Sequence, residues 1–116
     1  MKKNHSKGNG AKNDHLKVIR TVIQQIVETF HPQKIVLFGS YAYGWPRRDS
    51  DVDLLVVMKS HKRPVDRTVE ILKSLRIYPF PMDLLVRTPE EIRRRLRMGD
   101  FFFEEILRKG KVLYER

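Results

Sequence analysis

Three aspartates stand at the beginnings of two short apolar stretches of this chain. Asp51 and Asp53 open the stretch DVDLLVVM, and Asp83 stands at the matching place in MDLLVR. Because side chains alternate across a β-strand, Asp51 and Asp53 are expected on one face of a strand. If the two strands are neighbours, all three carboxylates converge on one place. Carboxylate oxygens in this number suit Mg²⁺ or Mn²⁺, and pairs of such ions serve phosphoryl and nucleotidyl transfer.

A glycine-serine pair precedes the aspartates. Gly39-Ser40 follows the apolar run KIVLF, and ten residues separate it from Asp51. Glycine lets the backbone approach an anion closely, and Ser40 can offer its hydroxyl and an N–H group at a helix start. Alone, such a pair is usually an ordinary turn, and a lone Asp-x-Asp more often caps a strand or pairs with arginines such as Arg47 and Arg48. The glycine-serine pair and the aspartates together therefore predict a phosphate-binding turn beside a metal site.

The surrounding pattern of apolar residues predicts the elements that position these groups. Apolar residues at helical spacing predict a helix over 16–30, which Asn13 or Asp14 can cap and Pro32 ends. Short apolar runs predict strands at 34–38, 51–58, 82–87 and 111–114, and further helices are predicted at 64–77, from Pro89 onward and at 101–109. The fold class expected is α/β (α+β), with a mixed sheet of about four strands flanked by helices.

Length and composition predict one small domain. The chain has 116 residues, and residues 1–13 carry lysine, asparagine and glycine with almost nothing apolar, so we expect a disordered basic arm followed by a folded domain over 14–116. The chain contains no cysteine, which fits a reducing, cytoplasmic setting. No apolar run approaches the roughly 18–20 residues that a membrane span requires, so no membrane contact is expected.

The net charge of +10 indicates a phosphate-bearing partner or an acidic protein surface. Aromatic and basic residues do not interleave as they do in stacking platforms, so nucleic acid is not expected as the main partner. Four arginines share one predicted helix, at positions 93, 94, 95 and 97, and the three consecutive phenylalanines 101–103 cannot all be buried on one helix face. These residues can form a partner surface, or a solvated basic face and an edge of the core.

The stretch GSYAYGWPRRDSDVDLLVV, followed by Asp83, resembles the signature of the DNA polymerase beta nucleotidyltransferase superfamily. The helix and strand before it and the final KVLYE resemble the minimal nucleotidyltransferases, so the resemblance covers residues 14–116. It implies that Asp51 and Asp53 hold two Mg²⁺ or Mn²⁺ ions, and that Asp83 holds the catalytic ion and helps to activate the acceptor hydroxyl. It also implies that Gly39 and Ser40 bind the triphosphate of ATP.

Arg47 and Arg48 lie in the same loop, and we predict that they contact phosphate, although the family motif does not fix them. Simple exposed charge is the alternative for this pair.

Minimal nucleotidyltransferases are often encoded beside a HEPN-domain RNase toxin. The resemblance implies an antitoxin that transfers AMP from ATP to a tyrosine hydroxyl of this toxin. Two alternatives remain: an antitoxin that neutralises its toxin by binding without chemistry, and a basic nucleic-acid-binding module. Only about 30 residues follow Asp83, so the chain has no room for a further domain that would hold the acceptor. A hetero-oligomer with the acceptor protein is therefore expected.

Overall fold

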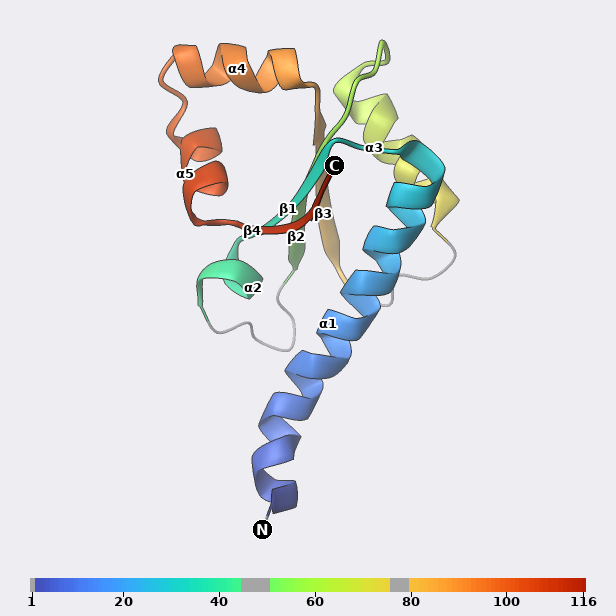
Figure 1. The fold of residues 1–116 in the computed structure, drawn as a ribbon, viewed down its shortest axis with the longest axis vertical. Coiled ribbons are helices and arrows are strands. Elements are labelled where there is room, and N and C mark those ends of the chain that lie inside the picture. Colours follow the sequence, from blue (N-terminus) through green and yellow to red (C-terminus); the bar gives the residue numbers. More distant parts are fainter. Residues whose placement is uncertain (1, 45–50, 76–79) are drawn as a thin grey trace.

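The computed structural model describes the backbone of residues 2–44, 51–75 and 80–116, with side chains from Leu16 onward within these ranges (Figure 1). Helices and strands alternate along most of the chain. Their bounds are α1 (Lys2–Phe30), β1 (Lys34–Phe38), α2 (Ser40–Tyr43), β2 (Val52–Val57), α3 (Pro64–Ser74), β3 (Met82–Arg87), α4 (Pro89–Arg97), α5 (Phe101–Lys109) and β4 (Lys111–Glu115).

The four strands form one mixed sheet in the order β3-β2-β1-β4. β1 pairs antiparallel with β2 and with β4, whereas β2 and β3 run parallel. The crossover from β2 to β3 contains α3, as a parallel pair requires. This small α+β domain with a mixed sheet of four strands confirms the expected fold class.

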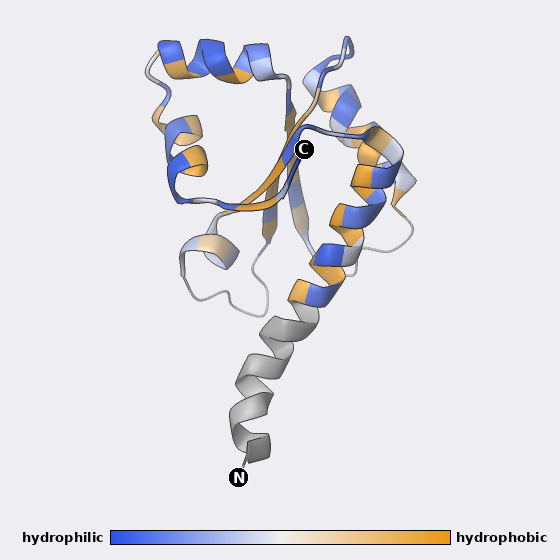
Figure 2. Cartoon of the chain, viewed as in Figure 1, coloured by the Kyte–Doolittle hydropathy of each residue, from blue (hydrophilic) through white to orange (hydrophobic). Residues whose placement is uncertain are grey.

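Helices cover both faces of the sheet. Alternation along β2 sends Leu54 and Val56 into one apolar cluster, which contains side chains of α1 and α3, and Leu55 and Val57 into a second cluster beneath α4 and α5. Figure 1 shows these helix pairs on opposite sides of the strands, and Figure 2 shows that the hydrophobic residues of the helices gather toward the sheet. Because the centre of β2 is buried on both faces, only its first residues can carry polar chemistry.

Arg67 is a buried charge that joins α3 to the beginning of α4. Its side chain is only 5% exposed, and its guanidinium donates two hydrogen bonds to the carboxylate of Glu91, with N···O distances of 2.7 and 3.2 Å. Glu91 also closes the capping box of α4 with Thr88. The hydrogen bond from Arg67 holds the pKa of Glu91 down at about 2. The sequence pattern predicted both helices but not this connection between them.

The structure differs from the sequence expectations at the ends of two elements. α1 begins at Lys2, where a disordered arm was expected over 1–13. The segment contains no proline, but it does contain two glycines, so helix propensity does not account for this start. The domain boundary at residue 14 stays a prediction. α3 ends at Ser74, and the expected continuation toward Ile77 lies outside the described residues.

In the described part of the chain, every helix is too short or too polar to cross a lipid bilayer.

Candidate active site

The first residues of β2 and β3 meet at one edge of the sheet. Asp53 and Asp83 are direct partners in the parallel β2–β3 pair, and on the other side Asp53 lies opposite Phe38, the last residue of β1. Residues that pair in register project from the same face, so both carboxylates lie on the side of the sheet that α5 covers. The prediction that the strands of Asp53 and Asp83 are neighbours is therefore confirmed. The role of Asp83 stays a prediction.

Asp51 and Asp83 act electrostatically on Asp53. Asp53 is partly buried, whereas Asp51 and Asp83 are exposed. Burial, followed by the charges of Asp83 and Asp51, raises the pKa of Asp53 from 3.8 to about 6. An acid in this position is held in an environment that disfavours its negative charge, and a nearby cation would relieve that penalty.

Gly39 lies directly against the carboxylate of Asp53. A β-carbon built on Gly39 would stand 2.0 Å from Oδ2 of Asp53, far inside van der Waals contact. The backbone of Gly39 also has φ 75° and ψ −157°, a combination that side-chain-bearing residues rarely adopt. Both observations require glycine at this position, and they join the turn after β1 to the acid on β2.

The short helix α2 begins immediately after Gly39. The carbonyl of Gly39 accepts hydrogen bonds from the N–H groups of Ala42 and Tyr43, at 3.0 and 2.9 Å. Tyr41 fixes this helix because its side chain is buried in the cluster beneath α1 and α3. Ser40, by contrast, is exposed at the first turn. The turn therefore presents Ser40 to solvent beside the acids, as a phosphate-binding turn requires.

The donor set fits a divalent cation in its chemistry. Asp51, Asp53 and Asp83 offer hard oxygen ligands, which Mg²⁺ and Mn²⁺ prefer. Among the described residues, no three acidic or histidine side chains are gathered closely enough to coordinate one ion. The expected convergence of all three aspartates on one ion is therefore not found, although Asp53 and Asp83 are partners in the sheet. Mg²⁺ commonly binds through only one or two carboxylates together with substrate phosphates and water. The acids thus suit an ion that arrives with a nucleotide.

The rim of the site comes from α2 and α5. Tyr43 is 40% exposed, and its pKa is raised by partial burial and, to a lesser degree, by the charges of Glu105 and Asp53. On the same face the ring of Phe102 stands edge-on to Phe38, with 5.9 Å between the ring centroids. Sequence reasoning did not place Glu105 or Phe102 near the acids, because no local pattern indicates that α5 packs beside α2.

Arg47 and Arg48, predicted to contact phosphate, lie outside the described residues.

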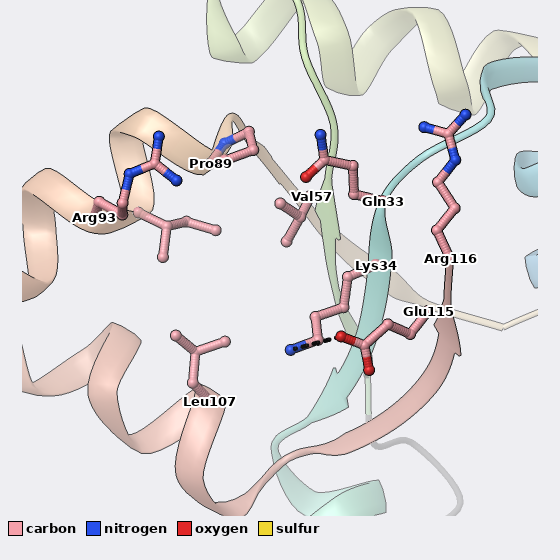
Figure 3. A pocket seen from close by; sticks show the side chains of 9 residues that line it. Gln33, Lys34, Val57, Pro89, Arg93, Leu107, Glu115 and Arg116 are labelled. Carbon is pink, nitrogen blue, oxygen red and sulfur yellow. Dashed lines mark ion pairs between the residues drawn. The ribbon is translucent and has the colours of Figure 1, made fainter.

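A cavity of about 500 Å³ lies at the other end of the sheet (Figure 3). Its walls include Val57 and Leu107, and Lys34 forms an ion pair with Glu115 at its edge, with 3.7 Å between Nζ and Oε2. Lys34 and Phe38 are the two ends of β1, so this cavity is about 13 Å from the acids along the strand. It is separate from the candidate active site.

Comparison with known proteins agrees with this geometry. Residues 16–112 match the family model described as a nucleotidyltransferase domain. A relative from Methanocaldococcus jannaschii, named "Putative protein adenylyltransferase MJ0604", is 30% identical over 83 residues, which are 71% of this chain and 78% of that protein. The fold is similar to the crystal structure of a "putative nucleotidyltransferase" from Sulfolobus solfataricus, with a TM-score of 0.68, 20% identity, and coverage of 94% of this chain and 87% of that one. With its paired strands, its acids and its family match together, the chain belongs to the nucleotidyltransferase domain family.

Proposed function

We propose that this nucleotidyltransferase moves AMP from ATP to a tyrosine hydroxyl of a partner protein. The observation that carries the proposal is the position of Asp53, whose carboxylate lies against Gly39 and whose pKa is raised by burial and then by the charges of Asp83 and Asp51. The contact between Asp53 and Gly39 supports a metal-binding acid beside a phosphate-binding turn. The name of the archaeal relative, a protein adenylyltransferase, favours AMP as the transferred group and a protein as the acceptor.

Each residue has a definite part in the proposed reaction. Asp51 and Asp53 would hold both divalent ions, and Asp83 would hold the catalytic ion and help to activate the acceptor hydroxyl. Gly39 and Ser40 would bind the triphosphate. Bound Mg²⁺ or Mn²⁺ would neutralise the negative charge of the leaving pyrophosphate and would lower the pKa of the acceptor hydroxyl. The acceptor oxygen forms a bond to the α-phosphorus, the bond from that phosphorus to the bridging oxygen breaks, and pyrophosphate leaves. The hydroxyl proton passes to the carboxylate of Asp83.

We further propose that the acceptor is a HEPN-domain toxin and that this chain is its antitoxin. The support is the resemblance of residues 14–116 to minimal nucleotidyltransferases. The two proteins would form a hetero-oligomer, and the absence of cysteine fits a cytoplasmic setting. Neither a membrane nor nucleic acid is needed for this reaction.

Label transfer tests the proposed reaction. The chain is incubated with Mg²⁺, the HEPN-domain protein, and ATP labelled at either the α- or the γ-phosphate. We expect label from α-labelled ATP only, because AMP and not phosphate is transferred. Asp53→Asn should abolish the label, whereas Asp66→Asn, on the exposed start of α3, should retain it. Equal labelling by wild type and Asp53→Asn would overturn the proposal.

A non-catalytic antitoxin is the alternative, because direct binding could also silence the toxin. The doubly substituted chain Asp51→Ala/Asp53→Ala separates the two functions. Under the proposed function, cells that express the toxin with this variant stop growing. Full rescue of growth by the variant would establish that binding alone is sufficient.

A further inference from the structure

We propose that the corner between α4 and α5 docks an acidic, amphipathic segment of the acceptor protein beside the carboxylates. The surface, here called the α4–α5 ledge, consists of the exposed apolar side chains Leu96, Met98, Phe101 and Phe102 with the exposed cations Arg94 and Arg97. This inference rests on the proposed function, and it adds the surface that recognises the acceptor and the chemistry of what binds there.

The apolar part of the ledge has no covering within the described chain. Phe101 is 81% exposed and Met98 70% exposed, whereas the third phenylalanine of the run, Phe103, is buried against the sheet. Of the three phenylalanines, one thus belongs to the core and two face outward. Large apolar side chains that gather on a surface generally mark an interaction site.

The ledge is held in place rather than loosely attached. Asp100 caps α5, and its carboxylate accepts hydrogen bonds from the N–H groups of Phe102 and Phe103 at 3.0 and 3.3 Å. Gly99, with φ 78°, makes the tight turn between the two helices. A preorganised surface of this kind loses little conformational entropy when a partner binds.

Phe102 connects the ledge to the candidate active site. Its ring contacts both Phe38, at 5.9 Å between centroids, and Phe103, at 5.4 Å. Phe38 is the strand partner of Asp53 and the residue immediately before Gly39. A segment bound over Phe102 would therefore lie next to Phe38, the strand neighbour of Asp53.

The positive charge of the ledge indicates what kind of partner binds there. Arg93 and Arg95 are paired with Glu90 and Asp100, but no carboxylate in the described part of the chain pairs with Arg94 or Arg97. Two exposed cations beside an apolar corner are complementary to a protein segment with acids on one side and apolar residues on the other. Figure 2 shows the strongly hydrophilic α4 leading into the hydrophobic corner.

A protein segment fits this surface better than single-stranded RNA does. Glu104 and Glu105 are exposed on the next turn of α5. The backbone of RNA carries a charge at every nucleotide and would meet these acids, whereas a protein can keep its own acids toward α4.

The first test measures binding without nucleotide, so its outcome does not depend on catalysis. The probe is a fluorescent amphipathic peptide with leucines on one face, glutamates on the other and one tyrosine. We expect this peptide to bind the full chain, and we expect Phe101→Ser/Met98→Ser and Arg94→Glu/Arg97→Glu each to weaken binding ~10-fold or more.

Matched controls separate the ledge from general surface effects. Val65→Ser removes an exposed apolar side chain on α3, and Arg20→Glu/Lys73→Glu makes the same change in net charge elsewhere. Both should bind the acidic peptide like wild type. A wild-type chain that does not bind the peptide, that prefers the same peptide with lysines for glutamates, or that prefers oligoadenylate RNA would overturn the proposal.

The second test adds ATP and Mg²⁺ and follows AMP transfer to the HEPN-domain protein. The ledge variants should have a higher KM for the acceptor, whereas Asp53→Asn should lower kcat to the background rate. A ledge variant that lowers kcat with KM unchanged would contradict a docking role. If wild type transfers no AMP but binds the acidic peptide through the ledge, the proposed reaction fails and the docking surface stands.

Discussion

Asp53 and Gly39 together define the site at the scale of single residues. The close approach of the Asp53 carboxylate to the α-carbon of Gly39 explains why a strand-end acid and a turn glycine occur together. The spacing of Gly39, Asp51 and Asp53 could be interpreted from sequence because strand alternation is a local rule. The contact between them could not, because it depends on how β1 and β2 pair.

Substitution of Gly39 should disturb both the fold and the chemistry. Gly39→Ala puts a methyl group into the Asp53 carboxylate and forces an unfavourable backbone angle, so we expect the free energy of unfolding to fall by about 1–3 kcal/mol, together with loss of AMP transfer. Urea denaturation measures the first effect. Gly44→Ala is the control, since nothing lies within 4 Å of its β-carbon position. Equal stability of the two variants would show that the close approach is absent in solution.

The raised pKa of Asp53 predicts a pH-dependent stability in metal-free buffer. The folded-state pKa is about 6 against an ordinary 3.8, so the neutral acid stabilises the fold at low pH, and this contribution is lost as the pH rises through about 6. Asp53→Asn mimics the neutral acid at every pH. Thermal unfolding in EDTA should therefore show a higher Tm for the variant than for wild type above about pH 7 and no difference near pH 4. A Tm difference that is constant with pH would contradict the raised pKa that burial and the neighbouring carboxylates give Asp53.

At the scale of elements, β2 and β3 bring two acids together and α5 supplies the rim. The sequence predicted the four strands nearly to the residue, because each is a short apolar run. It did not predict the contact of Phe102 with Phe38, or the pair that joins α3 to α4. Both are contacts between segments far apart in the chain, and no periodicity indicates them.

The Arg67–Glu91 pair should be important for stability. Glu91→Gln leaves the buried guanidinium of Arg67 without its charged partner. We therefore expect the free energy of unfolding to fall by about 2 kcal/mol at neutral pH. The pKa of Glu91 is lowered from 4.5 to about 2, so the wild type should lose this advantage as the pH falls through that range.

Glu90→Gln is the matched control for this pair. Glu90 forms an exposed ion pair with Arg93, which should contribute less than about 1 kcal/mol. Chemical denaturation of both variants, at neutral and acidic pH, measures the difference. If Glu90→Gln lowers the free energy of unfolding as much as Glu91→Gln does, the burial of the Arg67–Glu91 pair does not explain its contribution to stability.

The whole molecule is a sheet with chemistry at one edge and helices on both faces. Its sequence predicted the fold class and the two strands that begin beside Asp53 and Asp83, since both follow from apolar runs and the residues that open them. The start of α1 at Lys2 was not predicted, because amino-acid composition alone does not distinguish a polar disordered arm from a polar helix.

The intact mass of the HEPN-domain protein is the most direct test of the central claim, that the acids around Asp53 transfer AMP to a partner. After incubation with this chain, ATP and Mg²⁺, the protein is measured by mass spectrometry and its modified residue is located. We expect the added mass of one or more AMP groups on tyrosine with wild type, and an unmodified protein with Asp53→Asn or with EDTA. An unmodified protein with wild type, or the same adduct with Asp53→Asn, would contradict the claim.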